Sequence, residues 1–420
     1  MITHAKSIYG SVPLIGWLVG MLLAVLTESF FGNTLAYALY LPKVPALFGL
    51  TIVLKQPSLF PATVFYVLLI YCLPIFAVAG LTATWANRFA AAMEKLPLWF
   101  SAIIHIGVLY LVLHLWTDLS DYRLQISKLT MIAVMLTLSI NVINGYMGEF
   151  SCSHPGFMAL GAYASSTFSL ALFHQDRLFG TPLLPEFLGP YMFPMGLLLG
   201  GAAASLGAMV VAIPSFRTRG DYLAIISLAF MFIVKSVLEN LEVVGGARGM
   251  GGQPHWATLP AVFIGMTVCI GVINNFVNST MGKALNAVRD NEAAAEAMTV
   301  NTRRTKMTAF MFGAFWAGVA GGFYAHELRY INPSSFGIQM LAEILAMVYF
   351  GGLNSVVGSV VGALSIQMLS EALRPLELFK WIIIPLLLIL VMIFRPTGLI
   401  AFREFNIRKT FGPKVLKKRI

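Results

Sequence analysis

Charged residues are scarce in this sequence. Only 11% of the 420 residues are Asp, Glu, Lys or Arg, whereas hydrophobic residues make up 58%. A water-soluble globular protein carries about 25% charged residues, so this composition excludes an ordinary soluble domain. One helical crossing of a bilayer needs about 20 apolar residues, and the chain is long enough for roughly ten crossings. We therefore expect an all-α integral membrane protein, a polytopic helical bundle of about 10 to 12 transmembrane or re-entrant helices.

Cysteines and catalytic motifs are also few. The three cysteines, Cys72, Cys152 and Cys269, are dispersed, which excludes a disulfide framework and a zinc site. The sequence MGKA at 281–284 lacks the upstream glycine and the hydroxyl residue of a phosphate-binding loop. No HExxH pair and no nucleophile elbow is present. We therefore expect neither an enzyme nor a metal or cofactor bound by the chain itself.

Acidic residues are outnumbered by basic ones, 18 against 28, which gives a net charge of +10. In a soluble protein this balance would suggest nucleic acid, but here the basic residues lie between apolar runs, as in cytoplasmic loops. We expect no nucleic acid partner. The segments 214–220, 279–306 and 395–420 are placed in the cytoplasm, and the C-terminus with them. The loop 243–252 is then expected on the outer side.

Apolar stretches follow one another along the chain, at about 12–31, 35–54, 61–85, 98–117, 129–143, 155–173, 191–213, 221–240, 258–278, 307–325, 338–371 and 379–394. The first shows no cleavage site, so we expect a retained span and not a signal peptide. The stretch at 35–54 contains two prolines and a lysine, and is either a span or a surface or re-entrant segment. The stretch at 338–371 is too long for one crossing. Gly351, Gly352 and Asn354 predict a break within it, so we expect three helices from residue 338 onward.

The composition changes along the chain. Residues 1–126 are richer in aromatic side chains and poorer in glycine than the rest. We expect them to form an N-terminal membrane extension of about 3 to 4 helices. Residues 127–400 would then be the functional core, and 401–420 a basic cytoplasmic tail.

Polar residues interrupt the apolar pattern between residues 141 and 163. Polar groups and irregular backbone at membrane depth are tolerated where they line a wet cavity or are packed inside protein. This stretch is therefore our candidate for the translocation pathway. For His154, the alternative to a pathway role is a histidine that is packed inside the protein or lies at the membrane interface. The candidate pathway residues are Asn141, Asn144, Glu149, Ser151, Ser153 and His154.

The loop at 241–256 is rich in glycine and contains one arginine. Glycines permit tight backbone conformations next to a partner or a solute, and arginine pairs with anions. The alternative is a flexible loop. The residues of interest in it are Gly245, Gly246, Arg248 and Gly249.

The basic segment 279–306 contains a helix-favouring run from Asn291 to Met298. Asp290 and Glu292 lie near its start, where negative charge favours a helix. A short helix between two spans is poorly placed for chemistry but can insert into a groove on a soluble partner. The alternative is a solvated loop that happens to be helical.

Four motifs occur in order along the second part of the chain: RGDYLAI at 219–225, GGARGMGG at 245–252, RDNEAAAEAM from 289 followed by VN, and RPTGL at 395–399. Together they resemble the permease subunit of bacterial branched-chain amino acid ABC importers, the LivM type, over about residues 127–400.

The resemblance implies a multi-pass inner membrane permease that moves branched-chain or related apolar amino acids. It implies ABC ATPase subunits that use the ATP, a second, LivH-like permease, and an external substrate-binding protein. It places the glycine-rich loop near an outer gate or the docking site of that binding protein. The residues expected to dock on the ATPase are Arg289, Asp290, Asn291, Glu292, Ala293 and Glu296.

Two alternatives stay open. Glu149 and Pro155 depart from the family's usual pattern, so the cargo could be urea, a short amide or another amino acid. An ion-coupled secondary transporter is the competing class, and it would use buried ionisable groups such as Glu149, His154 or Glu343.

Overall fold

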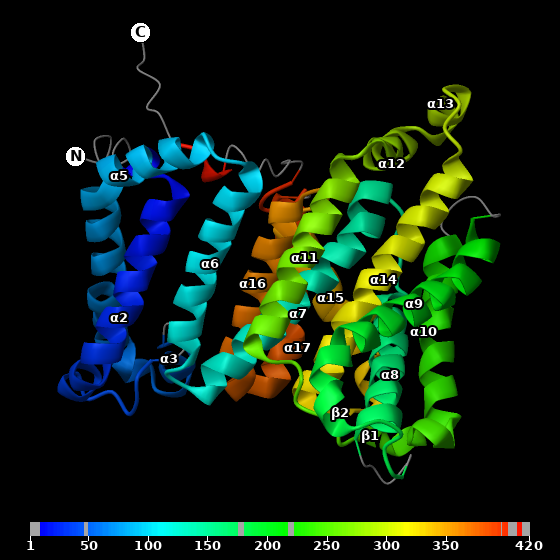
Figure 1. Cartoon of the computed structure of the whole chain (residues 1–420), viewed down its shortest axis with the longest axis horizontal. Helices are drawn as coiled ribbons and strands as arrows, with labels where there is room; N and C mark the ends of the chain where they lie inside the picture. Colours follow the sequence, from blue (N-terminus) through cyan, green and yellow to red (C-terminus); the bar gives the residue numbers. More distant parts are fainter. Residues whose placement is uncertain are drawn as a thin grey trace. The chain divides into compact units, whose positions relative to one another are not determined.

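Helices make up nearly all of the structure. The computed structural model describes residues 9–45, 49–174, 180–216, 222–395, 397–401 and 410–413. Within these ranges, ten helices are long and apolar enough to cross a membrane, and two shorter apolar helices, Val356–Ala372 and Phe379–Phe394, accompany them. Figure 1 shows the helices along the chain, with short strands only at β1 and β2. The expected class, an all-α polytopic membrane protein, is confirmed.

The chain divides into two compact units. Unit 1 comprises residues 1–127, 370–377 and 405–420, and unit 2 comprises 128–369 and 378–404. The described helices of unit 1 are α2 (Leu14–Ala38), α3 (Leu50–Lys55), α4 (Phe60–Val67), α5 (Leu73–Glu94) and α6 (Leu98–Thr117). A π-helical turn at Leu68–Cys72 joins α4 to α5, so residues 57–94 form one long span. Helix α7 (Asp121–Asn141) begins in unit 1 and continues into unit 2.

The stretch at 35–54 is not a membrane span. Helix α2 ends at Ala38, and α3 starts only at Leu50 and is six residues long. Tyr40 has a φ of 54°, a left-handed conformation that ends the helix. Pro42 and the proline three residues later prevent the helix from resuming. Of the two interpretations that the sequence left open, the short surface or re-entrant segment is correct.

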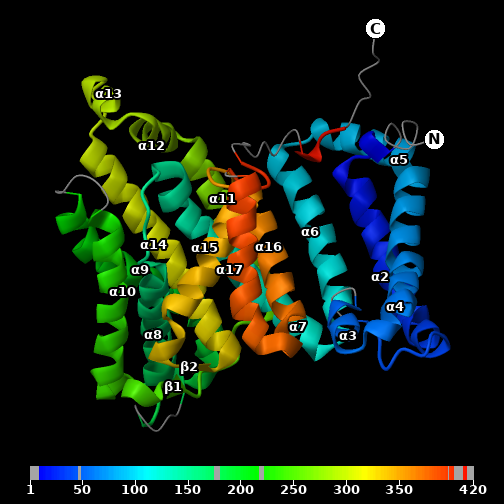
Figure 2. The same cartoon turned by 180° about the vertical axis from the view of Figure 1, so that it is seen from behind.

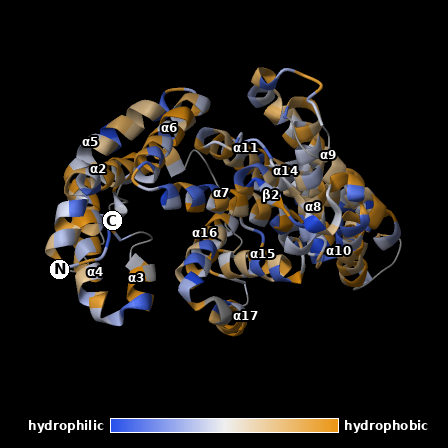
Figure 3. Cartoon of the chain, turned by 90° about the horizontal axis from the view of Figure 1, so that it is seen from below, coloured by the Kyte–Doolittle hydropathy of each residue, from blue (hydrophilic) through white to orange (hydrophobic). Residues whose placement is uncertain are grey.

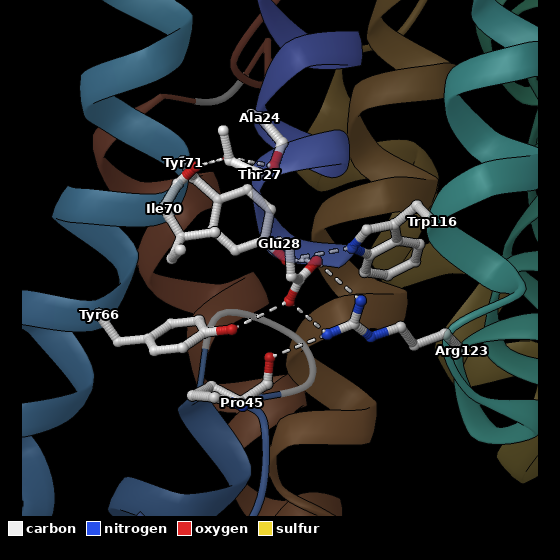
Figure 4. Close-up of polar contacts among 9 residues, drawn as sticks. All are labelled: Ala24, Thr27, Glu28, Pro45, Tyr66, Ile70, Tyr71, Trp116 and Arg123. Atoms are coloured by element: carbon white, nitrogen blue, oxygen red, sulfur yellow. Dashed lines mark hydrogen bonds and ion pairs between the residues drawn. The ribbon is translucent and has the colours of Figure 1, made fainter. Parts of the chain in front are cut away.

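A buried charge cluster holds unit 1 together. The Arg123 guanidinium donates to both carboxylate oxygens of Glu28, at 2.7 and 2.9 Å, and both side chains are at most 2% exposed. The Tyr71 hydroxyl donates to the same carboxylate at 2.6 Å, and Tyr66 approaches it at 3.4 Å. The guanidinium lies 4.9 Å from the ring of Trp116 (Figure 4). Because every charge has a partner, the cluster joins α2, α4, α6 and the start of α7 without leaving an unpaired buried charge.

Unit 2 is a helical bundle with distinct ends. Helices α12 and α13 lie at one end and strands β1 and β2 at the other, in both views of the chain (Figures 1 and 2). Its described elements are α8 (His154–Phe173), α9 (Gly189–Ser215), α10 (Tyr222–Asn240), β1 (Met250–Gly251), α11 (Leu259–Asn278), α12 (Thr280–Asp290), α13 (Glu292–Ala297), α14 (Thr302–Leu328), β2 (Tyr330–Ile331), α15 (Ile338–Gly351), α16 (Val356–Ala372) and α17 (Glu377–Phe394).

Small residues let the central helices α8, α9 and α14 approach closely. A Cβ on Gly161 would collide with the backbone of Gly318, and a Cβ on Gly200 would lie 2.7 Å from the Gly161 carbonyl oxygen. In lipid, where helices gain nothing from apolar burial against one another, such close backbone packing is a main source of association.

The break predicted within 338–371 is confirmed. Helix α15 ends at Gly351 and α16 begins at Val356, and three helices, α15, α16 and α17, are described from residue 338 onward. Gly352 has a φ of 129° and Asn354 a φ of 55°, so the turn uses backbone conformations that ordinary residues avoid.

The surface of the helices is largely apolar. Figure 3 shows hydrophobic residues along most of the helical ribbons. Large apolar side chains are strongly exposed, among them Leu81 at 83%, Val210 at 68% and Ile393 at 67%. Such a surface suits lipid contact. Parts of the predicted motifs, Arg219 to Asp221 and Pro396, and most of the tail, 402–409 and 414–420, lie outside the described residues.

Candidate functional site

The helical bundle of unit 2 is interrupted between α7 and α8. After Asn141 the chain forms a π-helical turn, Val142–Met147, and then runs without helix to His154. We call residues 141–154 the broken segment. Helix α8 starts inside the bundle, because the Phe157 ring lies 5.5 Å from that of Phe310 in the third turn of α14. Irregular backbone at this depth is stable only where protein surrounds it, and most of the segment is buried.

The side-chain amide of Asn141 forms hydrogen bonds to the turn between α15 and α16 and to the start of α16. Its Nδ2 donates to the Ser355 carbonyl oxygen at 3.0 Å and to Ser359 Oγ at 2.6 Å. Its Oδ1 accepts from the Asn354 backbone N–H at 3.1 Å. The side chain is 1% exposed. Asn141 therefore links two interrupted parts of the bundle.

Three of the remaining buried polar residues of the broken segment are hydrogen-bonded to one another. Asn144 Oδ1 accepts from the Ser151 N–H at 3.2 Å, and Ser151 Oγ lies 2.9 Å from Ser153 Oγ. His154 is fully buried with its ring against the Ser139 backbone. The structure thus brings together three of the six predicted pathway residues, Asn144, Ser151 and Ser153, in one buried hydrogen-bonded group.

Glu149 takes part in an ion-pair bridge. Its Oε1 lies 2.7 Å from Lys306 Nζ, and the same ammonium lies 2.9 Å from Glu292 Oε2. The lysine is half-buried, whereas Glu292 is exposed on α13. A residue predicted for the pathway and one predicted for docking are therefore joined through a third residue, which the sequence analysis missed.

Arg289 makes a second connection between α12 and the broken segment. Its Nη1 donates to the Gly145 carbonyl oxygen at 3.5 Å. The aliphatic part of the side chain packs over Gly148, where an added Cβ would collide with it. Gly148 has a φ of 75°, which favours glycine. The guanidinium also pairs with Asp290 at 2.8 Å.

Helix α13 projects from the end of unit 2 (Figure 1). The Asn291 side chain caps it by accepting from the Ala294 N–H at 3.0 Å. Ala293 and Glu296 are exposed, and Met298 just beyond the helix is 77% exposed. The predicted short helix is present. Its exposed side chains are available to a partner, whereas Glu292 pairs with Lys306 and Ala295 is buried.

The glycine-rich loop lies at the opposite end of unit 2 (Figure 2). Met250 and Gly251 pair with Ile331 and Tyr330 as two antiparallel strands. The Tyr330 hydroxyl donates to the Arg248 carbonyl oxygen at 2.6 Å, and the Arg248 side chain is exposed. The loop is therefore held in place and is not a free connection.

The backbone conformation favours glycine at three of the predicted loop positions. Gly245, Gly246 and Gly249 have φ values of 89°, 54° and 80°. A Cβ on Gly249 would also collide with the Ile331 carbonyl oxygen. The predicted loop residues thus lie together, and far from those of the broken segment and α13.

Buried polar residues near the β1–β2 end were not anticipated. Lys128 of α7 and Glu327 of α14 form an ion pair of 2.5 Å in which both side chains are 3% exposed. The neighbouring His326 Nε2 lies 2.7 Å from Ser169 Oγ. A lysine at the start of an apolar run was the available signal, because ionisable residues inside membrane helices are rare.

The contacts described above connect α13 to the broken segment. No group of three potential metal ligands occurs among the residues that the structure describes. The site consists of the exposed helix α13, the side chains of Lys306 and Arg289, and the largely buried broken segment that both side chains contact. Lys306 and Arg289 are therefore side chains through which α12, α13 and the broken segment are in contact.

Comparison with known proteins identifies the family. Residues 122–394, more than half of the chain, match the family described as branched-chain amino acid transport system / permease component. The high-affinity branched-chain amino acid transport system permease protein LivM of Escherichia coli is 30% identical over 323 residues, 69% of this chain and 72% of that protein. The LivM protein of Salmonella typhimurium is 28% identical over the same shares.

A more distant relative has another cargo in its name. The autoinducer 2 import system permease protein LsrC of Photorhabdus luminescens is 27% identical over 134 residues, 30% of this chain and 40% of that protein. No solved structure gives a significant match. With a family match of this extent and ten helices that could cross a membrane, the chain is a multi-pass membrane protein that belongs to the family of branched-chain amino acid transport system permease components.

Proposed function

We propose that this chain is a transmembrane permease subunit of an ATP-driven importer in a bacterial inner membrane, with its C-terminus in the cytoplasm. In this proposal it binds no cofactor and hydrolyses no ATP. Two ABC ATPase subunits, a second LivH-like permease and an external substrate-binding protein complete the complex. The permease moves branched-chain or related apolar amino acids.

The observation that carries the proposal is the direct connection from α13 to the broken segment. Lys306 joins Glu292 to Glu149, and Arg289 contacts the backbone of Gly145. An ATPase that grips an exposed helix needs such a connection to convert its own closure into rearrangement of the pore. A secondary transporter, which works as a single chain, has no use for a protruding helix of this kind.

The roles of the site residues follow from this proposal. Residues 289–296 dock on the ATPase, and the broken segment lines or gates the pathway. The loop around Arg248 lies near the outer gate and receives the binding protein. Residues 1–126 are a membrane extension added to the permease core at 127–400. These roles are supported by exposure of α13 and by burial of polar groups in the broken segment.

The test is purification of the tagged chain in mild detergent, identification of bound proteins by mass spectrometry, and reconstitution in liposomes. We expect a Walker-containing ATPase and a second hydrophobic permease to copurify, and uptake to require ATP and a binding protein. Competition among leucine, urea and short amides then identifies the cargo class. A chain that runs alone and transports in response to a proton gradient would overturn the importer proposal in favour of a secondary transporter.

A further inference from the structure

Unit 1 contains a cavity that the proposed transport function does not use. Its volume is about 420 Å³, and it lies between the short helix α3 and the turn at Arg374–Leu376. All of its lining residues belong to unit 1. The polar ones are Lys43, Lys55, Gln56, Tyr122, Glu371 and Arg374.

The cavity has an excess of positive charge. It is lined by three cations and one carboxylate, so its formal charge is 3 − 1 = +2. Glu371 is already engaged, because its Oε1 accepts from the Tyr122 hydroxyl at 2.9 Å and from Arg374 at 3.0 Å. Within the described part of the chain no ion pair involves Lys43 or Lys55, and both are exposed. The two lysines are therefore available to an anion from outside the chain.

The position of the cavity favours a lipid over a soluble anion. Tyr122 lies in the first turn of α7, at the end of a candidate membrane span. Arg374 lies in the short turn between the two apolar helices α16 and α17. The ends of membrane helices lie at the depth of lipid headgroups. Ile52 and two prolines form an apolar part of the lining beside the polar residues. A lipid has both a polar headgroup and apolar chains, and so matches a lining of this mixed kind.

We propose that this cavity binds the phosphate of an anionic phospholipid headgroup. The two lysines pair with the phosphate, Gln56 donates to it or to the headgroup hydroxyls, and the Glu371 contacts with Arg374 and Tyr122 hold the opposite wall. Basic pockets at the ends of membrane helices recognise anionic headgroups by this chemistry. In this proposal unit 1 binds a lipid, and this binding does not depend on which solute the permease core transports.

The test uses the full chain in lipid nanodiscs that contain phosphatidylglycerol as the probe, with phosphatidylcholine nanodiscs for comparison. After transfer to detergent, retained phosphatidylglycerol is counted by mass spectrometry. The variant Lys43→Gln/Lys55→Gln is expected to lose about 30-fold in affinity, because each lysine contributes about 1 kcal/mol and a factor of ten corresponds to about 1.4 kcal/mol. Lys43→Arg/Lys55→Arg is expected to keep the lipid.

The matched control is Arg88→Gln/Lys95→Gln, which removes the same charge from exposed positions of unit 1 that do not line the cavity. It is expected to retain phosphatidylglycerol as the unaltered chain does. Equal retention by the lysine-to-glutamine variant would overturn the proposal. Displacement of the lipid by millimolar glycerol 3-phosphate would also overturn it and assign the cavity to a soluble phosphate ester. An elution volume equal to that of the unaltered chain shows that the variant is folded.

Discussion

Lys306 lies between Glu149 and Glu292, with its Nζ 2.7 Å from one carboxylate and 2.9 Å from the other. Glu149 belongs to the broken segment and Glu292 to the first turn of α13. Two residues separated by more than a hundred positions in the sequence are therefore bonded to one ammonium group. This arrangement connects α13 to the broken segment through a single side chain.

Replacement of Lys306 by glutamine is expected to separate transport from ATP hydrolysis. Each of its partly exposed ion pairs contributes only about 0.2–1 kcal/mol to stability, so the variant should fold and assemble. Transport per ATP hydrolysed should fall by roughly tenfold, the size of a typical coupling energy. The measurement is uptake and phosphate release in the same proteoliposomes, with Lys306→Arg as control. An unchanged ratio in the glutamine variant would show that the bridge transmits nothing.

Charge reversal at Glu296 is expected to weaken binding of the ATPase. This residue is exposed on α13, and no ion pair involves it among the described residues, so Glu296→Lys perturbs the partner and not the fold. An unfavourable charge at an interface should reduce ATPase affinity by roughly tenfold or more. Glu242→Lys, an exposed change at the opposite end of unit 2, is the matched control. A pull-down in which both variants behave alike would contradict the docking role.

Alkylation of Cys152 is expected to be slow and to accelerate with pH. Burial raises the pKa of the Cys152 thiol above its ordinary value, so little thiolate is present at pH 7. A chain with Cys72→Ala and Cys269→Ala leaves this thiol alone. Its labelling by iodoacetamide should rise about tenfold per pH unit below the pKa. If the broken segment opens during transport, labelling at fixed pH should increase when ATP and substrate are supplied. Equal labelling rates with and without ATP and substrate would show that the surroundings of Cys152 do not open during transport.

Breaking the buried pair between Lys128 and Glu327 is expected to destabilise unit 2. Lys128→Met leaves a carboxylate buried and unpaired, at a cost of about 3–5 kcal/mol. The double variant Lys128→Met/Glu327→Met removes both charges and should recover most of that loss. Thermal unfolding in detergent, followed by loss of the monodisperse species, measures both. If the double variant is no more stable than the single one, the pair has a role beyond charge neutralisation.

Substitution of Gly249 is expected to act only at the β1–β2 end. Alanine there must adopt a φ of 80° with an extended ψ and collides with the Ile331 carbonyl oxygen, at a cost of roughly 1–3 kcal/mol. Docking of the binding protein should weaken, whereas ATPase binding should persist. Gly271→Ala in α11, where an added Cβ meets open space, is the control. Loss of ATPase binding in Gly249→Ala would show that the change disrupts the whole unit.

Much of the fold follows from local features of the sequence. Apolar runs of sufficient length predict spans, and Gly351, Gly352 and Asn354 predict the break between α15 and α16, because backbone conformation at these positions depends on the residues themselves. The helix after Asn291 was equally predictable from its cap and its alanines. The segment at 35–54 was ambiguous, since two prolines are compatible with either a kinked span or a surface segment.

Sequence alone determined the class of the protein, which stretches are apolar enough to span a membrane, and which residue types occur in the candidate site. Tertiary structure decided which of those residues meet. The sequence does not indicate that Glu149 and Lys306 form an ion pair. The same is true of the pairs Glu28–Arg123 and Lys128–Glu327. Pairing across such separations depends on how helices pack, and close packing depends on shape complementarity among glycines far apart in sequence, such as Gly161 and Gly318. A local pattern contains no record of that complementarity.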